Sequence, residues 1–321
     1  MIFNCCFRRL PTVVFSGETK GRSVDAKDAG TTIVTITVIG TMSRNCSIHT
    51  LVENLTMNST DQGSSAQHTY LSAAIDAAHV GGRVLQDWIG RFSVREKSRA
   101  NLVTEADEAS QSAIVQTLKN RFPQHGFLGE ENLNERDATT EAFWIIDPLD
   151  GTSNYVHGFP YYAVSIGLWV RDHIEVGVIF DPTRNETFAA AFGHGATLNG
   201  QPIRTSGENE LKSAMAMASL PVATDRENPA VKRFLNALTK LQTVQRSGSA
   251  ALNLAYVASG RIDCFWSSSL HPWDVAAGAL LVAESGGTIT KLDGSTFDIF
   301  VPDLLSAATT LLGRELVTAL R

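Results

Sequence analysis

The sequence predicts an α+β fold in which two long helices pack on a mostly antiparallel sheet and a mixed, layered α/β lobe follows. Apolar residues first recur at three- and four-residue steps, as on one face of a helix. From residue 143 they form short β-branched runs joined by turns, and after residue 206 strand-like and helical stretches alternate. A chain of 321 residues with 43% hydrophobic side chains can bury a substantial core.

Two helices and an antiparallel sheet are expected in the first lobe, residues 61–205. The first helix follows the apolar pattern from Leu71 to Ile89, and the second begins after Thr104, whose hydroxyl can cap it, and ends before Pro123. Strands are predicted at 143–146, 163–170, 174–180 and 187–192, with turns at 171–173 and at Asn199-Gly200.

Helices and strands alternate in the second lobe, residues 206–321. The predicted strands lie at 214–219, near Val244, at 262–266 and near Ile289 and Ala307, and the predicted helices at 229–241, 249–259 and 275–285. Glycines stop the last two helices. Since no repeat or low-complexity linker follows Asp61, the two lobes are expected to share one core.

The first sixty residues differ in character from the rest. Their longest apolar stretch, 31–39, is far shorter than the ~20 residues of a membrane helix, and a secretory signal is poorly matched. Residues 57–61 resemble a polar natural start. We therefore expect residues 1–60 to be an extension, either disordered or upstream of the native start, and residues 61–321 to be the folded domain, with no membrane association.

Charge and cysteine content narrow the class further. A net charge of -6 without a Lys/Arg cluster argues against binding a nucleic-acid polymer. Cys5, Cys6 and Cys46 lie in the first fifty residues and Cys264 far beyond them, so no disulfide framework or zinc spacing can form. A cytoplasmic protein is predicted.

The segment from Asp147 to Thr152 carries the strongest chemical signal. It follows an apolar run, and Pro148 prevents the strand from continuing regularly, so Asp147 and Asp150 should lie at a turn beside the Leu149 carbonyl. These oxygen ligands can share one or two divalent cations. Gly151 and Thr152 add N–H groups that can approach an anion. The ordinary alternative is a turn with Asx hydrogen bonds.

Other candidate residues are ambiguous one by one. Glu130 follows a short apolar pair but could be a solvated surface residue. Asp274 could be a helix N-cap, and Asp107 could complete a capping box with Thr104. Residues 248–250 open a helix whose N-terminus could attract phosphate, or form a plain tight turn.

Taken in order and spacing, the segments 101–107, 129–132, 144–159 and 273–278 resemble the inositol monophosphatase family, over about residues 66–312. The resemblance implies a layered αβαβα sandwich and a magnesium-dependent phosphomonoesterase acting on a small phosphorylated substrate through metal-activated water. It also implies a homodimer and inhibition by lithium.

The resemblance also assigns roles to individual residues. Two or three Mg²⁺ ions are implied, one held by Glu130, Asp147 and the Leu149 carbonyl and a second by Asp147, Asp150 and Asp274. Glu130 and Thr152 would activate the water, with Thr152 oriented by Asp107. The implied substrate-binding residues are Asp150, Gly151, Thr152, Gly248, Ser249, Ala250 and Ser267.

Ser267 is a departure from the family pattern. Inositol monophosphatases have a glutamate there, seven positions before the aspartate of the Trp-Asp motif, and it contacts a hydroxyl of the substrate ring. A serine cannot make the same charge-assisted hydrogen bond. Histidinol phosphate, fructose bisphosphate and nucleotide 3′-phosphates therefore remain alternative substrates to inositol monophosphate, and a metal-dependent regulatory or binding protein remains the alternative to an enzyme.

Overall fold

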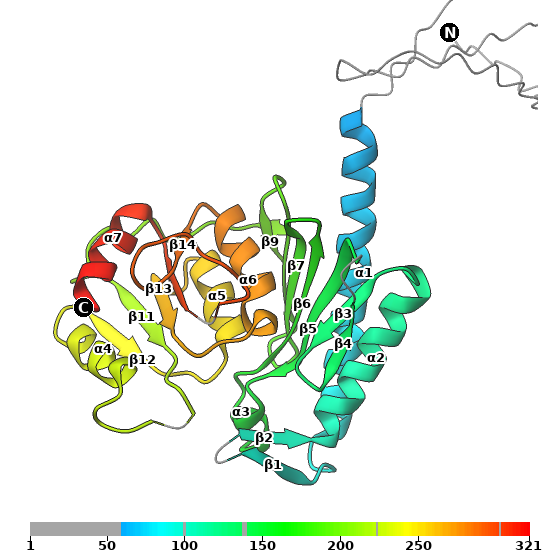
Figure 1. Cartoon of the computed structure of the whole chain (residues 1–321), viewed down its shortest axis with the longest axis horizontal. Coiled ribbons are helices and arrows are strands. Elements are labelled where there is room, and N and C mark those ends of the chain that lie inside the picture. Colours follow the sequence, from blue (N-terminus) through cyan, green and yellow to red (C-terminus); the bar gives the residue numbers. More distant parts are fainter. Residues whose placement is uncertain (1–58, 99–100, 137–139, 223, 302) are drawn as a thin grey trace, which may run out of the picture. The chain divides into compact units, whose positions relative to one another are not determined.

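An eight-stranded sheet, a five-stranded sheet, a two-stranded hairpin and the surrounding helices make up the fold (Figure 1). The computed structural model describes residues 59–98, 101–136, 140–222, 224–301 and 303–321. The expected extension, residues 1–60, lies outside the described residues except for its last two. Residues 62–321 form one unit by their internal contacts.

The first lobe begins with the two predicted long helices, α1 (Ser59–Trp88) and α2 (Glu105–Arg121). Helix α1 starts earlier than expected because its first turns lack the apolar spacing on which the prediction rested. Between the helices lies a hairpin that the sequence did not reveal, β1 (Val94–Ser98) with β2 (Asn101–Thr104). Thr104 caps α2 as predicted, since its side chain accepts a hydrogen bond from the Ala106 N–H.

The eight-stranded sheet is antiparallel except between β3 and β5, which confirms the predicted, mostly antiparallel sheet. Its order is β10-β9-β8-β7-β6-β5-β3-β4. The strands are β3 (Gly126–Gly129), β4 (Leu133–Glu135), β5 (Ala142–Asp150), β6 (Ala163–Val170), β7 (His173–Asp181), β8 (Glu186–Ala191), β9 (Ala196–Leu198) and β10 (Gln201–Pro202).

Strand β5 differs from its prediction in one respect. It does not end at residue 146 but continues through Pro148 to Asp150. The pairing with β6 breaks after Asp147 and resumes where Asp150 lies opposite Ala163. A proline is tolerated at such an irregularity because no ladder hydrogen bond is required of it there.

The second lobe is built on a five-stranded sheet of order β12-β11-β13-β15-β14. Its strands are β11 (Met215–Ala218), β12 (Thr243–Gln245), β13 (Cys264–Ser267), β14 (Thr288–Thr290) and β15 (Leu304–Ala307). Its helices are α4 (Pro229–Leu238), α5 (Ala250–Ala258), α6 (Pro272–Glu284) and α7 (Thr310–Ala319), of which α7 was not predicted.

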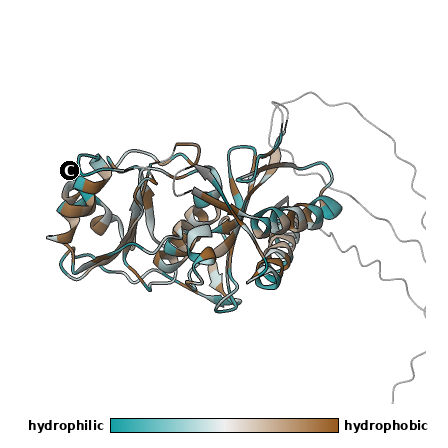
Figure 2. Cartoon of the chain, turned by 90° about the horizontal axis from the view of Figure 1, so that it is seen from below, coloured by the Kyte–Doolittle hydropathy of each residue, from teal (hydrophilic) through white to brown (hydrophobic). Residues whose placement is uncertain are grey.

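Buried side chains define five layers. One apolar cluster joins α1 and α2 to a face of the large sheet, a second joins its other face to α5 and α6 and on to the small sheet, and a third lies between the small sheet, α4 and α7. The predicted αβαβα sandwich is confirmed (Figure 1). Figure 2 shows apolar stretches on both strands and helices, with polar residues on parts of the helices and loops.

Two glycines let α6 lie directly on the large sheet. A Cβ atom added to Gly177 would lie 2.8 Å from the Ala277 carbonyl oxygen, and one added to Gly167 would lie 3.1 Å from the Ala276 Cβ. Side chains at these positions would push the helix away. Among the described helices, none combines the length and apolar character needed to cross a membrane.

Candidate metal centre

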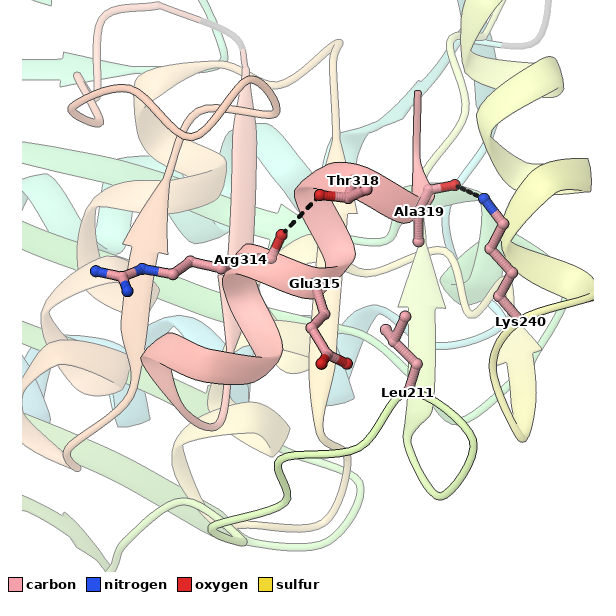
Figure 3. A pocket seen from close by; sticks show the side chains of 6 residues that line it. All are labelled: Leu211, Lys240, Arg314, Glu315, Thr318 and Ala319. Atoms are coloured by element: carbon pink, nitrogen blue, oxygen red, sulfur yellow. Dashed lines mark hydrogen bonds between the residues drawn. The ribbon is translucent and has the colours of Figure 1, made fainter.

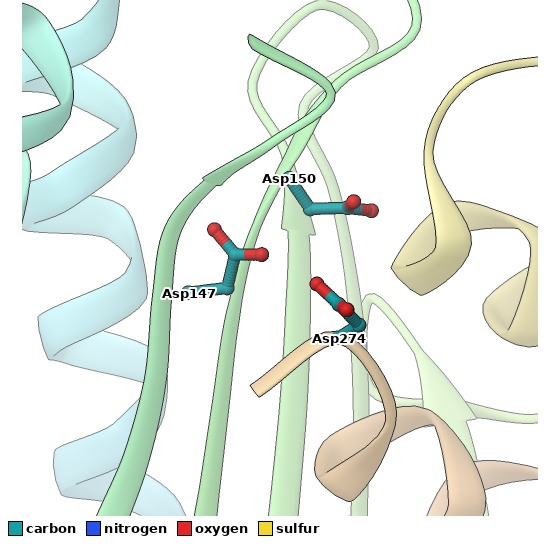
Figure 4. A group of neighbouring side chains, drawn as sticks. All are labelled: Asp147, Asp150 and Asp274. Atoms are coloured by element: carbon teal, nitrogen blue, oxygen red, sulfur yellow. The ribbon is translucent and has the colours of Figure 1, made fainter. Parts of the chain in front are cut away.

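Three aspartates converge where the large sheet meets α6. Asp147 and Asp150 come from the end of β5, and Asp274 comes from the first turn of α6 (Figure 4). Each offers a carboxylate oxygen, and these oxygens lie within 4.8 Å of one another. Hard oxygen donors at this separation suit Mg²⁺ or Ca²⁺.

The irregular end of β5 separates the two aspartates. The Leu149 N–H donates to Asp147 Oδ1 at 2.9 Å, so the Asx hydrogen bond of the ordinary alternative is present within the carboxylate cluster. Asp150 Oδ2 accepts from the Ser249 hydroxyl and, at 2.7 Å, from the Ala251 N–H. The carboxylates of this turn therefore both accept backbone hydrogen bonds and belong to the cluster.

Asp274 belongs to the third position of helix α6, not to its N-cap as the ordinary alternative had it. The N-cap is His271, whose backbone N–H donates to Asp274 Oδ2 at 2.6 Å. Ser165 on β6 pairs with Asp147 on β5, and its hydroxyl donates to the Trp273 carbonyl at 3.2 Å. Ser165 thus connects the start of α6 to the strand beside Asp147.

Burial and mutual repulsion disfavour the charged forms of these acids. Burial, followed by the charges of Glu130, Asp150 and Asp274, raises the pKa of Asp147 well above its usual value. Burial and then the charge of Asp150 raise the pKa of Asp274 in the same way. Burial raises the pKa of Asp150 from 3.8 to about 6, although the Ser249 and Ala251 hydrogen bonds act against the rise. A divalent cation would remove this penalty.

Glu130 lies at the end of β3, where its N–H donates to the Ile146 carbonyl of β5 at 3.3 Å. It is half-buried, and its charge raises the pKa values of both Asp147 and Asp274. Glu130 therefore lies close enough to the aspartates to add to the negative potential of the site. It does not belong to the group of oxygens within 4.8 Å of one another, which among the described residues consists of the three aspartates.

Asp107 and Thr152 meet beside the cluster. The Thr152 hydroxyl lies 3.2 Å from Asp107 Oδ1 and 3.2 Å from the Leu149 carbonyl oxygen. Asp107 Oδ2 accepts from the N–H and the hydroxyl of Thr104, so Asp107 forms the capping box. Through Oδ1 the same carboxylate also contacts Thr152 beside the aspartate cluster. Burial raises the pKa of Asp107.

The remaining predicted residues lie around the N-terminus of α5 and the end of β13. Gly248 has a positive φ of 93°, and the Ser249 hydroxyl caps α5 by accepting from the Leu252 N–H at 3.2 Å. Ala250 is the first residue of the helix. Ser267 is buried, with 1% of its surface exposed, and the Ser269 N–H lies 3.4 Å from its hydroxyl.

Several supporting residues escaped the sequence analysis. Ser110 donates to the Pro148 carbonyl at 3.1 Å, and the Gln111 side chain bonds both the N–H and the carbonyl of Glu131. Asn154 and Ser165 bond residues far away in the sequence. Polar residues at buried helix and strand positions are the one signal that could have found them.

A pocket of about 420 Å³ lies elsewhere, at the outer end of the second lobe (Figure 3). Its lining comes from α7, the turn after α4 and the segment before β11, namely Leu211, Lys240, Arg314, Glu315, Thr318 and Ala319. It contains none of the clustered aspartates. The aspartate cluster and this pocket are therefore separate features of the chain.

The chain is similar in sequence to known proteins. The sequence profile of the inositol monophosphatase family matches residues 66–321. Inositol monophosphatase 2 of Solanum lycopersicum is 41% identical over 240 residues, which are 72% of this chain and 90% of that protein. Nus factor SuhB of Pseudomonas aeruginosa is 41% identical over 234 residues, which are 70% of this chain and 86% of that protein.

Solved structures are similar over nearly their whole length. The extragenic suppressor protein suhB from Bartonella henselae has a TM-score of 0.75 and 34% identity, covering 79% of this chain and 98% of that one. The inositol monophosphatase from Anabaena (Nostoc) has a TM-score of 0.71 and 38% identity, covering 79% and 96%.

Proposed function

Because the chain belongs to the inositol monophosphatase family, whose members are metal-dependent phosphomonoesterases, we propose that it hydrolyses inositol monophosphate with Mg²⁺ as its cofactor. Membership makes the chain a hydrolase of small phosphate esters. The choice of inositol monophosphate and of Mg²⁺ is our proposal.

The observation that carries the proposal is the convergence of Asp147, Asp150 and Asp274 within 4.8 Å. In the proposed site, Glu130, Asp147 and the Leu149 carbonyl hold one ion, and Asp147, Asp150 and Asp274 hold a second. When bound, the ions supply Lewis-acid stabilisation of the charge on the transferred phosphoryl group. Two ions are enough to use all five proposed ligands, and a third ion is compatible with the resemblance to the family.

The neighbouring residues position the reactants. The 3.2 Å contact of the Thr152 hydroxyl with Asp107 supports a role for this pair, with Glu130, in orienting the attacking water and accepting its proton. The N–H groups of Gly151 and Thr152 hold phosphate oxygens. In this proposal Asp150 and residues 248–250 also contact the substrate, and Ser267 takes the position at which the family's glutamate contacts a hydroxyl of the substrate ring.

The names of the relatives and the residue at position 267 bear on the identity of the alcohol. Identity is 41% both to a relative named inositol monophosphatase and to one named Nus factor, so these names do not select a substrate by themselves. Several tomato relatives and the Anabaena structure bear the inositol name, which favours inositol monophosphate. Ser267 keeps histidinol phosphate, fructose 1,6-bisphosphate and nucleotide 3′-phosphates as alternatives.

Phosphate release decides between them. Inositol monophosphates, histidinol phosphate, fructose 1,6-bisphosphate and adenosine 3′,5′-bisphosphate are offered with Mg²⁺ and with EDTA. The proposal expects the highest kcat/KM for inositol monophosphate and no release with EDTA. A preference for another ester would replace the substrate, and binding without release from any ester would point to the regulatory alternative.

Further parts of the proposal concern the state of the protein. We expect a cytoplasmic homodimer that lithium inhibits, with residues 1–60 outside the folded domain. Light scattering measures the mass, and a lithium titration of phosphate release measures inhibition. Removal of residues 1–58 should leave kcat and KM unchanged, and a loss of activity would contradict the assignment of this segment as an extension.

A further inference from the structure

Asn154 connects two segments that are remote in the sequence. It lies in α3 (Thr152–Val156), which follows the turn at residues 147–151 that carries the proposed metal ligands, here called the metal-binding turn. Its side-chain Nδ2 donates to the Tyr161 carbonyl at 2.7 Å and to the Ser247 carbonyl at 2.8 Å. Both acceptors are carbonyl oxygens, so only the amide nitrogen can face them, and both of its hydrogens are used.

The connection closes into a ring of four residues. Asn253 Oδ1, on α5, accepts from the Tyr161 hydroxyl at 3.0 Å and from the Ser247 hydroxyl at 2.6 Å. Tyr161 and Ser247 are therefore each held by Asn154 through the backbone and by Asn253 through the side chain. Tyr161 and Asn253 are buried, so water cannot replace these bonds cheaply.

Gly248 lies directly against the ring. A Cβ atom added to it would be 2.9 Å from Asn154 Nδ2, and its φ of 93° already disfavours other residues. Gly151 in the metal-binding turn packs against the same group, with an added Cβ 3.1 Å from the Tyr161 carbonyl oxygen. The ring thus sits between the metal-binding turn and the segment that leads into α5.

These contacts indicate a role beyond general stability. Asp150 provides another connection between the metal-binding turn and the start of α5, because its carboxylate accepts from Ser249 and Ala251. Asp150 is also one of the proposed metal ligands, so the same carboxylate would have to bind the cation as well. The Asn154 ring contains none of the clustered carboxylates and holds the start of α5 independently of them.

We propose that Asn154 is a positioning residue that fixes residues 247–250 at the distance from the metal-binding turn needed to receive the substrate. This inference rests on the proposed phosphatase function, since it assumes that residues 248–250 contact the phosphate ester. Loss of Asn154 should therefore raise KM and leave kcat nearly unchanged, because the metal ligands and the Thr152–Asp107 pair stay in place.

The test compares Asn154→Leu, which has a similar volume and no donor, with the control Ser153→Ala at an exposed position of the same helix. Since two net hydrogen bonds are removed, KM for the preferred ester should rise about tenfold or more in Asn154→Leu, with kcat within about threefold of wild type. The control should match wild type. An unchanged KM, or an equal fall in kcat, would overturn the proposal.

Hydrogen exchange of the full chain in EDTA supplies a readout that does not depend on turnover. Amide exchange across residues 246–253 should accelerate about tenfold in Asn154→Leu, while β6 keeps its protection. If the wild type releases phosphate from no ester, the proposed function fails, and exchange still decides the positioning role. Unchanged exchange would refute that role even in an active enzyme.

Gly248→Ala approaches the same contact from the other side and covers the case in which Asn154→Leu does not fold. Its added Cβ should displace the Asn154 amide and reproduce the rise in KM. Combined with Asn154→Leu, it should add little, because both changes break one contact. Normal KM in Gly248→Ala, or full additivity in the double variant, would contradict the inference.

Discussion

Replacing Asp147 by asparagine should abolish activity and stabilise the metal-free fold. Asparagine keeps the oxygen that accepts the Leu149 N–H, so the turn retains its hydrogen bond. It removes a buried negative charge that faces Glu130, Asp150 and Asp274. In wild type a bound cation would balance this charge, whereas in EDTA the cost of keeping the charge or of protonating the carboxylate opposes folding.

The magnitude follows from the spacing of the carboxylates. Two unit charges separated by the 4.8 Å limit of the cluster repel by about 3.5 kcal/mol at an effective dielectric of 20. Protonation caps the penalty, since keeping one aspartate neutral at pH 8 costs about 5.5 kcal/mol relative to the unfolded chain. Asp147→Asn should therefore gain about 3 kcal/mol of unfolding free energy in EDTA at this pH.

Urea denaturation with EDTA and with Mg²⁺ is the assay. Mg²⁺ at a hundred times its dissociation constant should stabilise wild type by about 2.7 kcal/mol and the variant by much less. Asp181→Asn is the matched control, because Asp181 is also fully buried but pairs with Arg184 at 2.8 Å. It should lose stability, since its charge is compensated.

Two results would refute this reasoning. Wild-type-like phosphate release with Mg²⁺ in folded Asp147→Asn would remove Asp147 from the metal site. A loss of stability in EDTA of the same size as in Asp181→Asn would show that the carboxylate cluster is not under repulsion.

Three further predictions follow from the site. Folding raises the pKa of Asp150 from 3.8 to about 6, so between these pH values the metal-free folded state binds more protons than the unfolded chain. Its free energy of unfolding in EDTA should therefore fall as the pH rises from 4 to 7. A rise of this free energy over the same range would contradict the prediction. Thr152→Val should lower kcat by about 10²–10⁴ with little change in KM, whereas Thr152→Ser should stay near wild type; equal kinetics of the two variants would exclude the hydroxyl. Gly177→Ala should lower the free energy of unfolding by about 1–3 kcal/mol and reduce the stabilisation by Mg²⁺. The added Cβ would meet Ala277 and push α6, with Asp274, away from the sheet. An unaltered magnesium titration would show that α6 can adjust.

Local patterns predicted the regular elements well. Strand β6 has its predicted bounds, and Thr104 and Pro123 marked the ends of α2 within two residues. These features depend on periodicity and capping, which a short window contains. Helix α7 has Gly313 in its interior, and the β1–β2 hairpin is rich in charged residues, so neither carried a clear pattern.

Contacts between distant residues were not readable in this way. The Asn154–Ser247 hydrogen bond spans 93 positions, and the Ser165–Trp273 bond spans 108. No periodicity relates such residues, so the sequence placed Asp274 beside Asp147 only through the family resemblance. The one signal of the supporting residues, a polar side chain at a helix or strand position, did not distinguish them, because Asn and Ser are also ordinary in turns and at helix starts.

Helix α6 explains why metal binding and folding should be coupled in this chain. Its first turn supplies Asp274, its body packs on β6 and β7 over Gly167 and Gly177, and Glu284 near its end accepts the N–H groups of Gly193 and Gly195. The apolar cluster around it extends from the large sheet to Phe265 and Leu304 of the small sheet. If Asp147 and Asp274 hold a common cation, that link would therefore also stabilise the packing of α6 between the two sheets. Unfolding should proceed in a single transition whose midpoint rises with Mg²⁺ concentration.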